Sequence, residues 1–212
     1  MGWIEAWTEL AGDDERLCAE FTRAWDEGAR PAGGRLCCRP GCIPCCMGPF
    51  EITPLDGLRL AYSVTCLATD HPSRAALVMR RARHLVGAMA NAWGEEIRTG
   101  GLPSDQHERE ILLGEFASEP CPALSRRTGR CLLYTGRPLS CRSYGLPLSW
   151  GGETLPPCSL NLEGLRPSRW SLFAIAPDPE DLEGLLLTRI QALIPGLGDT
   201  TVAGAVLMAE LP

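Results

Sequence analysis

Two cysteine blocks are the part of this sequence whose residue types and spacing could do chemistry. They comprise Cys38, Cys42, Cys45 and Cys46 in the first block and Cys121, Cys131 and Cys141 in the second. Because Cys37 and Cys158 lie just beside them, nine of the 11 cysteines are clustered. Zinc, iron and iron–sulfur clusters are held in proteins by cysteine thiolates gathered in this way. The two blocks together therefore predict a metal centre.

A disulfide framework is the main alternative use of so many cysteines. The sequence opens Met1-Gly2-Trp3-Ile4-Glu5, without the basic and apolar stretches of a secretion signal, so we expect a cytoplasmic location. The number of cysteines is odd, and 212 residues are enough to build a core without covalent cross-links. We therefore interpret the cysteines as metal ligands.

Acidic residues are missing from both cysteine blocks. The ranges 35–46 and 121–142 contain seven arginines and no Asp or Glu, although the chain has 26 acidic residues and a net charge of −6. Positive surroundings favour the thiolate form of cysteine, so we expect these arginines to face the sulfur atoms. The negative net charge argues against a broad nucleic-acid surface.

The rest of the composition excludes several kinds of site. The chain has no lysine, which excludes Schiff-base catalysis, a Walker-type phosphate loop and a lysine general base. Its three histidines, His71, His84 and His107, are far apart in sequence, and we expect His84 and His107 at the surface or the edge of the core. A histidine-rich metal site is therefore not predicted.

Helical periodicity dominates the chain outside the cysteine blocks. It predicts helices near 13–27, 54–67, 73–98, 105–116 and 178–194, with the segment 201–211 ambiguous between helix and strand. No apolar run is long enough to span a membrane. We therefore expect one domain over residues 1–212 that is mainly α-helical, with irregular cysteine-rich loops and few short β-strands around a metal site.

Several local features are predicted around this frame. The segment 30–34 should break the first helix, and 50–52 should be a short extended piece. Pro44 should begin a helical turn that aims amide groups at Cys45 and Cys46. Cys18 and Cys66 fall on apolar helix faces, so we expect both thiols to be buried core residues.

The order of motifs resembles the CxxCxxCC family of zinc- or iron-chelating proteins, also called the YkgJ-type cysteine cluster family. The resemblance covers about residues 37–158 and rests on the first block followed by Cys121-Pro122-Ala123-Leu124, Gly129-Arg130-Cys131-Leu132-Leu133-Tyr134 and Arg137-Pro138-Leu139-Ser140-Cys141-Arg142. It implies metal ligation by Cys38, Cys42, Cys45, Cys46, Cys121, Cys131 and Cys141, with Cys158 as the eighth ligand. The family pattern gives Cys37 no role.

Side chains near the ligands should support the centre. We expect Tyr134 and Tyr144 to pack beside it, or else to be ordinary core residues. Arg137 and Arg142 should offset the charge of the thiolates and donate hydrogen bonds to sulfur. Arg137, Arg142 and Tyr134 are thus the predicted cofactor-binding residues around the metal ligands.

The identity of the metal is open at this point. Eight thiolates could form two separate zinc sites, one multinuclear site, or an iron–sulfur cluster with cysteines left over. Only Cys42 and Cys45 have the spacing of a zinc knuckle, and the nine-residue gaps around Cys131 suit a site shared by several loops. We therefore favour iron or an iron–sulfur cluster, with zinc as the alternative.

Three classes of function are compatible with such a centre. The first is metal handling or redox chemistry, with a metal ion as the partner. The second is a modifying enzyme, either of the kind that resembles the flagellin lysine methylase or a radical S-adenosylmethionine enzyme, whose spacing Cys38, Cys42 and Cys45 share. The radical enzymes need repeated strand–helix units, which this helical pattern lacks. The third class is a zinc-stabilised interaction module.

Overall fold

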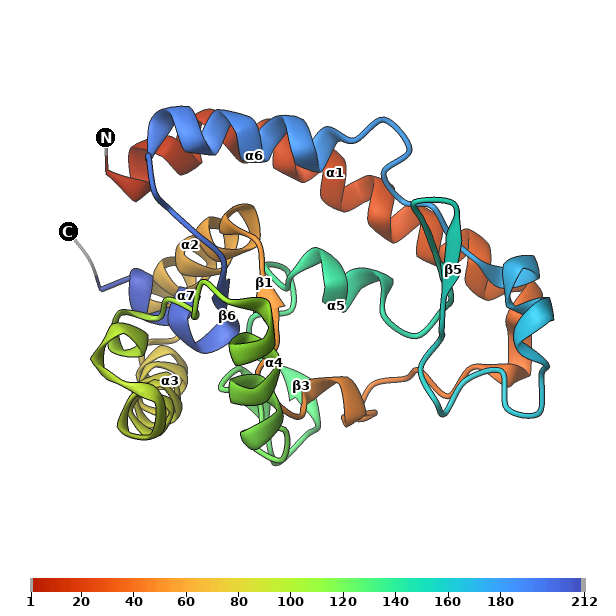
Figure 1. Cartoon of the computed structure of the whole chain (residues 1–212), viewed down its shortest axis with the longest axis horizontal. Helices are drawn as coiled ribbons and strands as arrows, with labels where there is room; N and C mark the ends of the chain where they lie inside the picture. Colours follow the sequence, from red (N-terminus) through yellow and green to blue (C-terminus); the bar gives the residue numbers. More distant parts are fainter. Residues whose placement is uncertain (1, 211–212) are drawn as a thin grey trace.

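Helices form most of the computed structural model, which describes residues 2–210 (Figure 1). The α-helices are α1 (Trp3–Ala32), α2 (Pro54–Asp70), α3 (Pro72–Trp93), α4 (Gln106–Glu115), α5 (Leu139–Ser143), α6 (Leu182–Leu193) and α7 (Val202–Met208). Short 3-10 turns are η1 (Gly33–Arg35), η2 (Pro44–Cys46), η3 (Glu95–Thr99) and η4 (Pro167–Phe173). The predicted mainly helical class is confirmed.

Residues 2–210 contain three short antiparallel strand pairs, of which two are local hairpins and one joins distant segments. Strand β1 (Glu51–Ile52) pairs with β6 (Thr200–Thr201), β2 (Leu124–Ser125) with β3 (Arg130–Cys131), and β4 (Leu148–Trp150) with β5 (Glu153–Leu155). The β1–β6 pair joins the end of the first cysteine block to the start of α7. The predicted extended piece at 50–52 and the ambiguous C-terminal segment are therefore partners.

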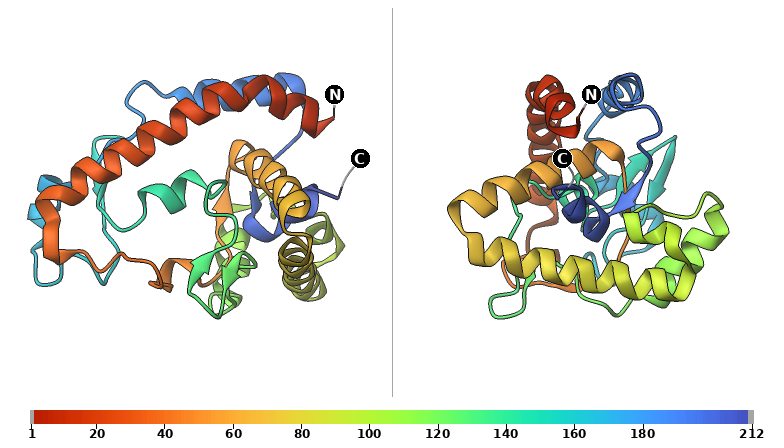
Figure 2. Two further views of the ribbon diagram at one scale, coloured as in Figure 1. Left: turned by 180° about the vertical axis from the view of Figure 1, so that it is seen from behind. Right: turned by 90° about the vertical axis from the view of Figure 1, so that its left-hand side faces the viewer.

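The core consists of two main packed clusters. Helices α2, α3 and α7 form one of them, which includes the fully buried Leu60, Val78 and Met89. Helices α1 and α6 run side by side across the other face of α2 and form the second, with Leu10, Leu58 and Ile190 inside it (Figures 1 and 2). Within residues 2–210, no helix is both long and apolar enough to cross a membrane.

Helix α1 is twice as long as the segment predicted for it. Its buried stripe begins at Trp3, Trp7 and Leu10, three residues at helical spacing that the sequence-based range of 13–27 left out. At its other end Pro31 lies inside the last turn, and the helix ends at Gly33, whose φ is +50°. Pro31 therefore lies just before the end of the helix, and Gly33 makes the turn that ends it.

The remaining helix ends follow their capping residues. The hydroxyl of Thr53 accepts the amide of Asp56, and the carboxylate of Asp105 accepts the amide of Glu108, so a side-chain N-cap begins both α2 and α4. Helix α3 ends at Trp93, earlier than predicted, because Gly94 adopts a φ of +110°. Helix α6 begins only at Leu182, and the Asp178 carboxylate caps it from outside by accepting the amides of residues 182 and 183.

The residues predicted to lie outside the site are mostly where we expected them. Cys18 is buried in the second core cluster, as predicted, and His84 and His107 are exposed. Cys66 is exposed, so the prediction that it is a buried core residue is wrong. It occupies the last part of α2, where the buried stripe of that helix has ended at Val64.

Candidate metal centre

The two cysteine blocks meet through their backbones. The amide of Cys121 donates to the carbonyl of Cys46 at 2.8 Å, and the amide of Gly48 donates to the carbonyl of Glu119 at 2.7 Å. Met47 and Pro120 form the antiparallel bridge between these bonds. In Figure 1 the loop of the first block, in orange, runs from the end of α1 back to β1 and passes below α5. Two segments that are 75 residues apart in the sequence are thereby in contact at the candidate site.

Cys121, Cys131 and Cys141 form what we call the hairpin group. Leu124 pairs with Cys131 across the β2–β3 hairpin, and Leu132 donates its amide to the carbonyl of Ala123 at 2.8 Å. Burial and the thiolates of Cys121, Cys131 and Cys45 raise the pKa of Cys141, which α5 brings against the hairpin. The second block therefore folds into one set of three mutually interacting thiols.

Cys38, Cys42 and Cys158 form a second set, the loop group. Burial and then the thiolates of Cys38, Cys45 and Cys158 raise the pKa of Cys42. Cys158, which no tight sequence motif surrounds, is thus placed beside the first block and is itself buried. Cys37 is exposed at the edge of this group.

Asn161 organises the loop group, although no sequence motif marks this residue. Its side-chain oxygen accepts the amide of Cys37 at 2.8 Å, and its side-chain nitrogen donates to the carbonyl of Gly145 at 2.7 Å and to the sulfur of Cys38 at 3.2 Å. Gly145 has a φ of +116°, and a Cβ there would lie 2.9 Å from the Cys38 sulfur. Only glycine therefore allows this close approach to the thiol.

Cys45 lies at the junction of the two groups. Its charge raises the pKa of Cys38 and Cys42 in the loop group and of Cys121 and Cys141 in the hairpin group. Cys45 and Cys46 occupy the 3-10 turn η2, which Pro44 begins as predicted. A hydrogen bond with Cys46, together with burial, raises the pKa of the Cys45 thiol. The vicinal pair thus stands between the two sets of thiols.

The thiols converge without forming a closed coordination shell. All 11 cysteines are free, and within residues 2–210 no three Cys, His, Asp or Glu side chains have a geometry that could already hold a metal ion. Burial raises the pKa of Cys121 to about 12, so this thiol carries its proton at neutral pH. Binding of a metal would displace such protons. The eight candidate thiols supply soft sulfur donors, which suit a thiophilic metal such as zinc or iron.

The arginines of the two blocks do not behave as the sequence suggested. Burial raises the pKa of Cys131, and the Leu133 amide and then the charge of Arg137 offset part of this rise. The guanidinium of Arg137 stacks on the Tyr134 ring at 3.8 Å. The expectation that the arginines face the sulfur atoms is wrong for six of the seven: Arg142 donates to the carbonyl of Thr135, and the other five are exposed, namely Arg35, Arg39, Arg126, Arg127 and Arg130. Only part of the positive charge is thus directed at the thiols.

Tyr134 and Tyr144 are not core residues, because their side chains are 62% and 51% exposed. Tyr144 nevertheless borders the loop group, since burial and then the thiols of Cys158 and Cys45 raise its pKa. The indole of Trp25 donates to the carbonyl of Tyr144 at 3.3 Å and attaches this segment to α1. Both tyrosines therefore lie at the rim of the candidate centre.

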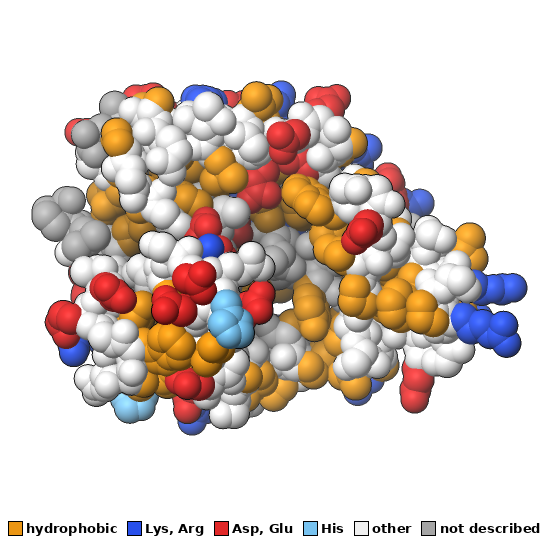
Figure 3. Space-filling model, in the orientation of Figure 1, with side chains coloured by type: hydrophobic (Ala, Val, Ile, Leu, Met, Phe, Trp, Pro, Cys, Tyr) orange, Lys and Arg blue, Asp and Glu red, His pale blue; other side chains and the backbone are white. Residues whose placement is uncertain are grey.

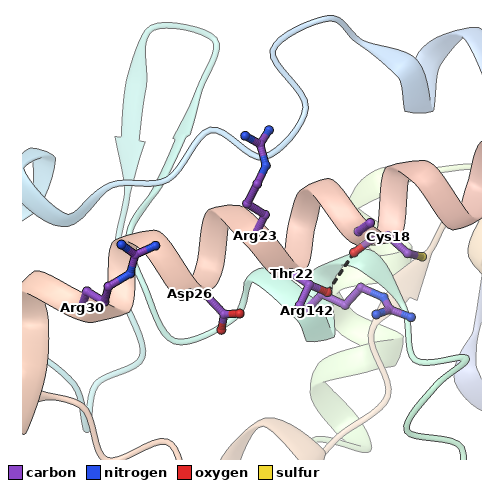
Figure 4. A pocket seen from close by; sticks show the side chains of 7 residues that line it. Cys18, Thr22, Arg23, Asp26, Arg30 and Arg142 are labelled. Atoms are coloured by element: carbon purple, nitrogen blue, oxygen red, sulfur yellow. Dashed lines mark hydrogen bonds between the residues drawn. The ribbon is translucent and has the colours of Figure 1, made fainter.

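Within the described part of the chain, neither Arg137 nor Arg142 donates a hydrogen bond to sulfur, so that prediction is wrong for both side chains. Arg142 donates to the carbonyl of Thr135, and its Nε is buried without a hydrogen-bond partner within residues 2–210. Its side chain lines an open pocket of about 520 Å³ between α1 and α5, beside Cys18 and Thr22 (Figure 4). Arg23 also lines this pocket but points to another side and pairs with Glu20. The charged side chains that line the pocket therefore do not converge on one point.

A buried ion-pair network lies under the hairpin group. Arg59 of α2 donates through Nε to Asp14 of α1 at 2.8 Å and through its terminal nitrogens to Asp14 and Asp56. Each of the three side chains is only 4% exposed. Burial lowers and the two carboxylates raise the pKa of Arg59, with a net rise. Such a network is stable only while all its partners are present.

This network holds the segment that leads to Cys141. Both carboxylate oxygens of Asp56 accept the amide of Leu139, at 3.0 and 3.2 Å, and Arg59 donates to the carbonyl of Arg137 at 3.5 Å. Gly136 packs so closely on α2 that a Cβ there would lie 1.8 Å from the Ser63 hydroxyl oxygen. The core helices therefore fix the position of α5 and of the Cys141 thiol on it.

Sequence reasoning missed Asp14 and Arg59 as contributors to the site. The signal was present, because each charged residue interrupts an otherwise apolar stripe. Asp14 stands between Leu10 and Leu17 on α1, and Arg59 stands between Leu58 and Leu60 on α2. Charged residues are almost never fully buried unless they are paired, so their place on a buried face predicts a partner.

Glu183 of α6 borders this network and makes folding sensitive to pH. The hydroxyl of Thr53 donates to it at 3.0 Å, while burial and then the charge of Asp56 raise its pKa from 4.5 to about 7. Because the folded chain holds the proton more tightly than the unfolded chain, the stabilisation is complete below about pH 4.5 and is lost as the pH rises through about 7.

We expect Glu183→Gln to remove this dependence, because glutamine keeps an acceptor for Thr53 and cannot ionise. Between about pH 5 and 8, the wild type should lose roughly 1–3 kcal/mol of unfolding free energy relative to the variant. Urea unfolding of both proteins at the two pH values measures the difference. Parallel stability curves over this range would contradict the assignment.

The chain has no match among protein-family models, and neither a curated protein nor a solved structure matches it. The resemblance to the CxxCxxCC family thus rests on the order of its cysteine motifs and stays a prediction.

Proposed function

We propose that this chain is a cysteine-cluster metal-binding protein, which holds iron, as ions or as an iron–sulfur cluster, or zinc. The ligands are the three thiols of the hairpin group, the three of the loop group, and the pair Cys45 and Cys46 between them. The observation that carries the proposal is this convergence of two thiol groups from distant parts of the chain on one vicinal pair.

The division of the thiols favours a centre that is shared between the groups. Each group supplies three thiols, one fewer than the four that a tetrahedral zinc site or a cubane cluster takes. Cys45 or Cys46 completes either group, and because both belong to the turn η2, a metal held by one group stands next to the other. Two neighbouring metals or one multinuclear cluster follow naturally from this arrangement.

A role in metal handling or redox chemistry is favoured over a purely structural one. Most buried residues of the two main core clusters come from α1, α2, α3, α6 and α7, with a smaller share from other segments that includes Ala123, Leu133 and Leu139. None of the eight proposed ligands is among the buried residues of these clusters. Cys121 and Cys131 only pack against the outside of the first cluster. A fold that buries its core without the thiols does not depend on the metal to form.

The metal content of the protein tests the proposal. After purification without oxygen, we expect elemental analysis to find iron or zinc bound in a fixed ratio to protein. A broad visible absorption band with acid-labile sulfide would identify an iron–sulfur cluster, and a colourless protein with zinc would identify zinc sites. A protein that binds neither metal, as purified or after anaerobic reconstitution, would contradict the proposed function.

Removal of the metal separates the handling role from the structural one. We expect a strong chelator to strip the metal while circular dichroism keeps most of its helical signal, because the core helices pack independently of the thiols. The stripped protein should take up metal again when it is supplied. Loss of most helical signal on chelation would instead identify a zinc-stabilised module.

A further inference from the structure

An exposed patch of positive charge lies beside the candidate metal centre. It is formed by the loop of the first block, by α3 and by the turn of the β2–β3 hairpin. We call it the arginine surface, and it consists of five exposed arginines, Arg39, Arg80, Arg126, Arg127 and Arg130, together with the half-buried Arg81. Arg39 follows Cys38 in sequence and Arg130 precedes Cys131, so the surface and the proposed ligands share two chain segments.

Contacts between the three segments bring these arginines together. Arg81 donates to the carbonyl of Leu124 at 2.6 Å, which joins α3 to the hairpin, and Figure 2 shows the hairpin beside this helix. A Cβ on Gly129 in the hairpin turn would lie 2.7 Å from the Cα of Gly41, so the turn packs on the loop that follows Arg39. The side chains therefore form one surface.

The charge of the arginine surface is not balanced by the chain itself. Residues 28–50, 71–94 and 120–152, which supply all six arginines, contain no Asp or Glu. Among the ion pairs of residues 2–210, none includes an arginine of this surface. Burial and the neighbouring charges of Arg126 and Arg80 lower the pKa of Arg81, as expected where like charges crowd. Protein surfaces normally intersperse charges of both signs, so this patch needs a reason.

We propose that the arginine surface docks an acidic segment of a protein partner. A guanidinium binds carboxylates in a bidentate geometry, so a row of Asp and Glu side chains would pair with these arginines. The partner would then stand next to Cys42 and Cys131. This docking follows from the surface charge and holds whether or not the thiols bind metal.

Charge outside the surface favours a protein segment over a nucleic acid. The chain has a net charge of −6, and acidic side chains spread over α4 and its surroundings in Figure 3, with the basic ones mainly at the rim. An extended polyanion would meet this acidic area, whereas a short peptide would sense only charges within about 8–10 Å. Ile43 and Met47 beside the surface are each 39% exposed and offer the apolar contacts that protein interfaces use.

Binding of a defined acidic peptide tests this proposal. The probe is a fluorescein-labelled peptide of repeated Glu-Asp-Leu units, titrated with the full-length protein and followed by fluorescence anisotropy. We expect salt-sensitive binding that weakens at least about tenfold in the variant with Arg126→Glu, Arg127→Glu and Arg130→Glu. A second variant, with Arg39→Glu and Arg80→Glu, changes the other two segments and should also weaken binding if the six arginines act as one surface.

A matched control and a competitor complete the experiment. The control replaces three exposed arginines elsewhere, Arg16, Arg166 and Arg169, by glutamate, which changes the net charge as much as the first surface variant does. We expect the control to bind the peptide within about twofold of the wild type. Oligothymidylate of equal charge should compete more weakly than the unlabelled peptide. Absence of peptide binding, equal losses in surface and control variants, or stronger competition by the oligonucleotide would each overturn the proposal.

Discussion

Replacement of Cys45 by serine is expected to lower metal affinity at least about tenfold and more than any other single cysteine replacement. The charge of Cys45 raises the pKa of thiols in both groups, whereas the charge of Cys158, another proposed ligand, raises the pKa of thiols in the loop group only. Loss of one residue near a metal typically costs ten- to a hundredfold in affinity even when that residue is not itself a ligand. Metal content after purification without oxygen and the midpoint of a chelator titration measure the effect.

Two cysteines outside the blocks provide controls for this replacement. Cys66 is exposed on α2, whereas Cys18 lies on the buried face of α1 and donates to Asp14 at 3.8 Å. We expect Cys66→Ser and Cys18→Ser to keep the wild-type metal content, although the buried replacement can lower stability. Equal metal content in Cys45→Ser and Cys18→Ser would contradict the ligand assignment. A similar affinity in Cys45→Ser and Cys158→Ser would contradict the central position of Cys45.

The helices could be predicted from the sequence because their causes are local. Thr53 and Asp105 cap α2 and α4 through side chains three residues from the amides that they accept, and such pairs are visible in the sequence. The start of α1 was missed because its stripe of Trp3, Trp7 and Leu10 was not followed far enough back. The start of α6 was missed because Asp178 caps it across a short non-helical turn.

The candidate site was predictable in composition but not in arrangement. Residue type and spacing predicted seven of the cysteines as ligands, and the family resemblance added Cys158. The division of these eight cysteines into two groups depends on contacts such as the bond between Cys121 and Cys46, across 75 residues of chain. Asn161 holds Cys38 from a segment with no motif. The predicted direction of the arginine side chains was wrong for the same reason, because the absence of acidic residues from a segment does not show which of its side chains face sulfur.

These contacts make the position of Cys141 depend on a charge network in the core. Asp56 accepts the amide of Leu139, two residues before Cys141, and Arg59 donates hydrogen bonds to both Asp56 and Asp14. Without Arg59, two buried carboxylates would face each other without a counter-charge. Loss of Arg59 should therefore lower the stability of the core and disturb the position of Cys141 in the hairpin group.

We therefore expect Arg59→Met to lower the free energy of unfolding by about 3–5 kcal/mol, the usual result of removing one partner of a buried ion pair. The matched control is Arg189→Met, which removes an exposed pair with Asp13, the neighbour of Asp14 on α1. Exposed pairs contribute at most about 1 kcal/mol, so this variant should be close to wild type. Urea unfolding measures the loss of unfolding free energy in both variants, which make the same substitution opposite neighbouring carboxylates of α1. Equal losses would contradict the prediction that the buried Arg59 network stabilises the fold more than the exposed pair does.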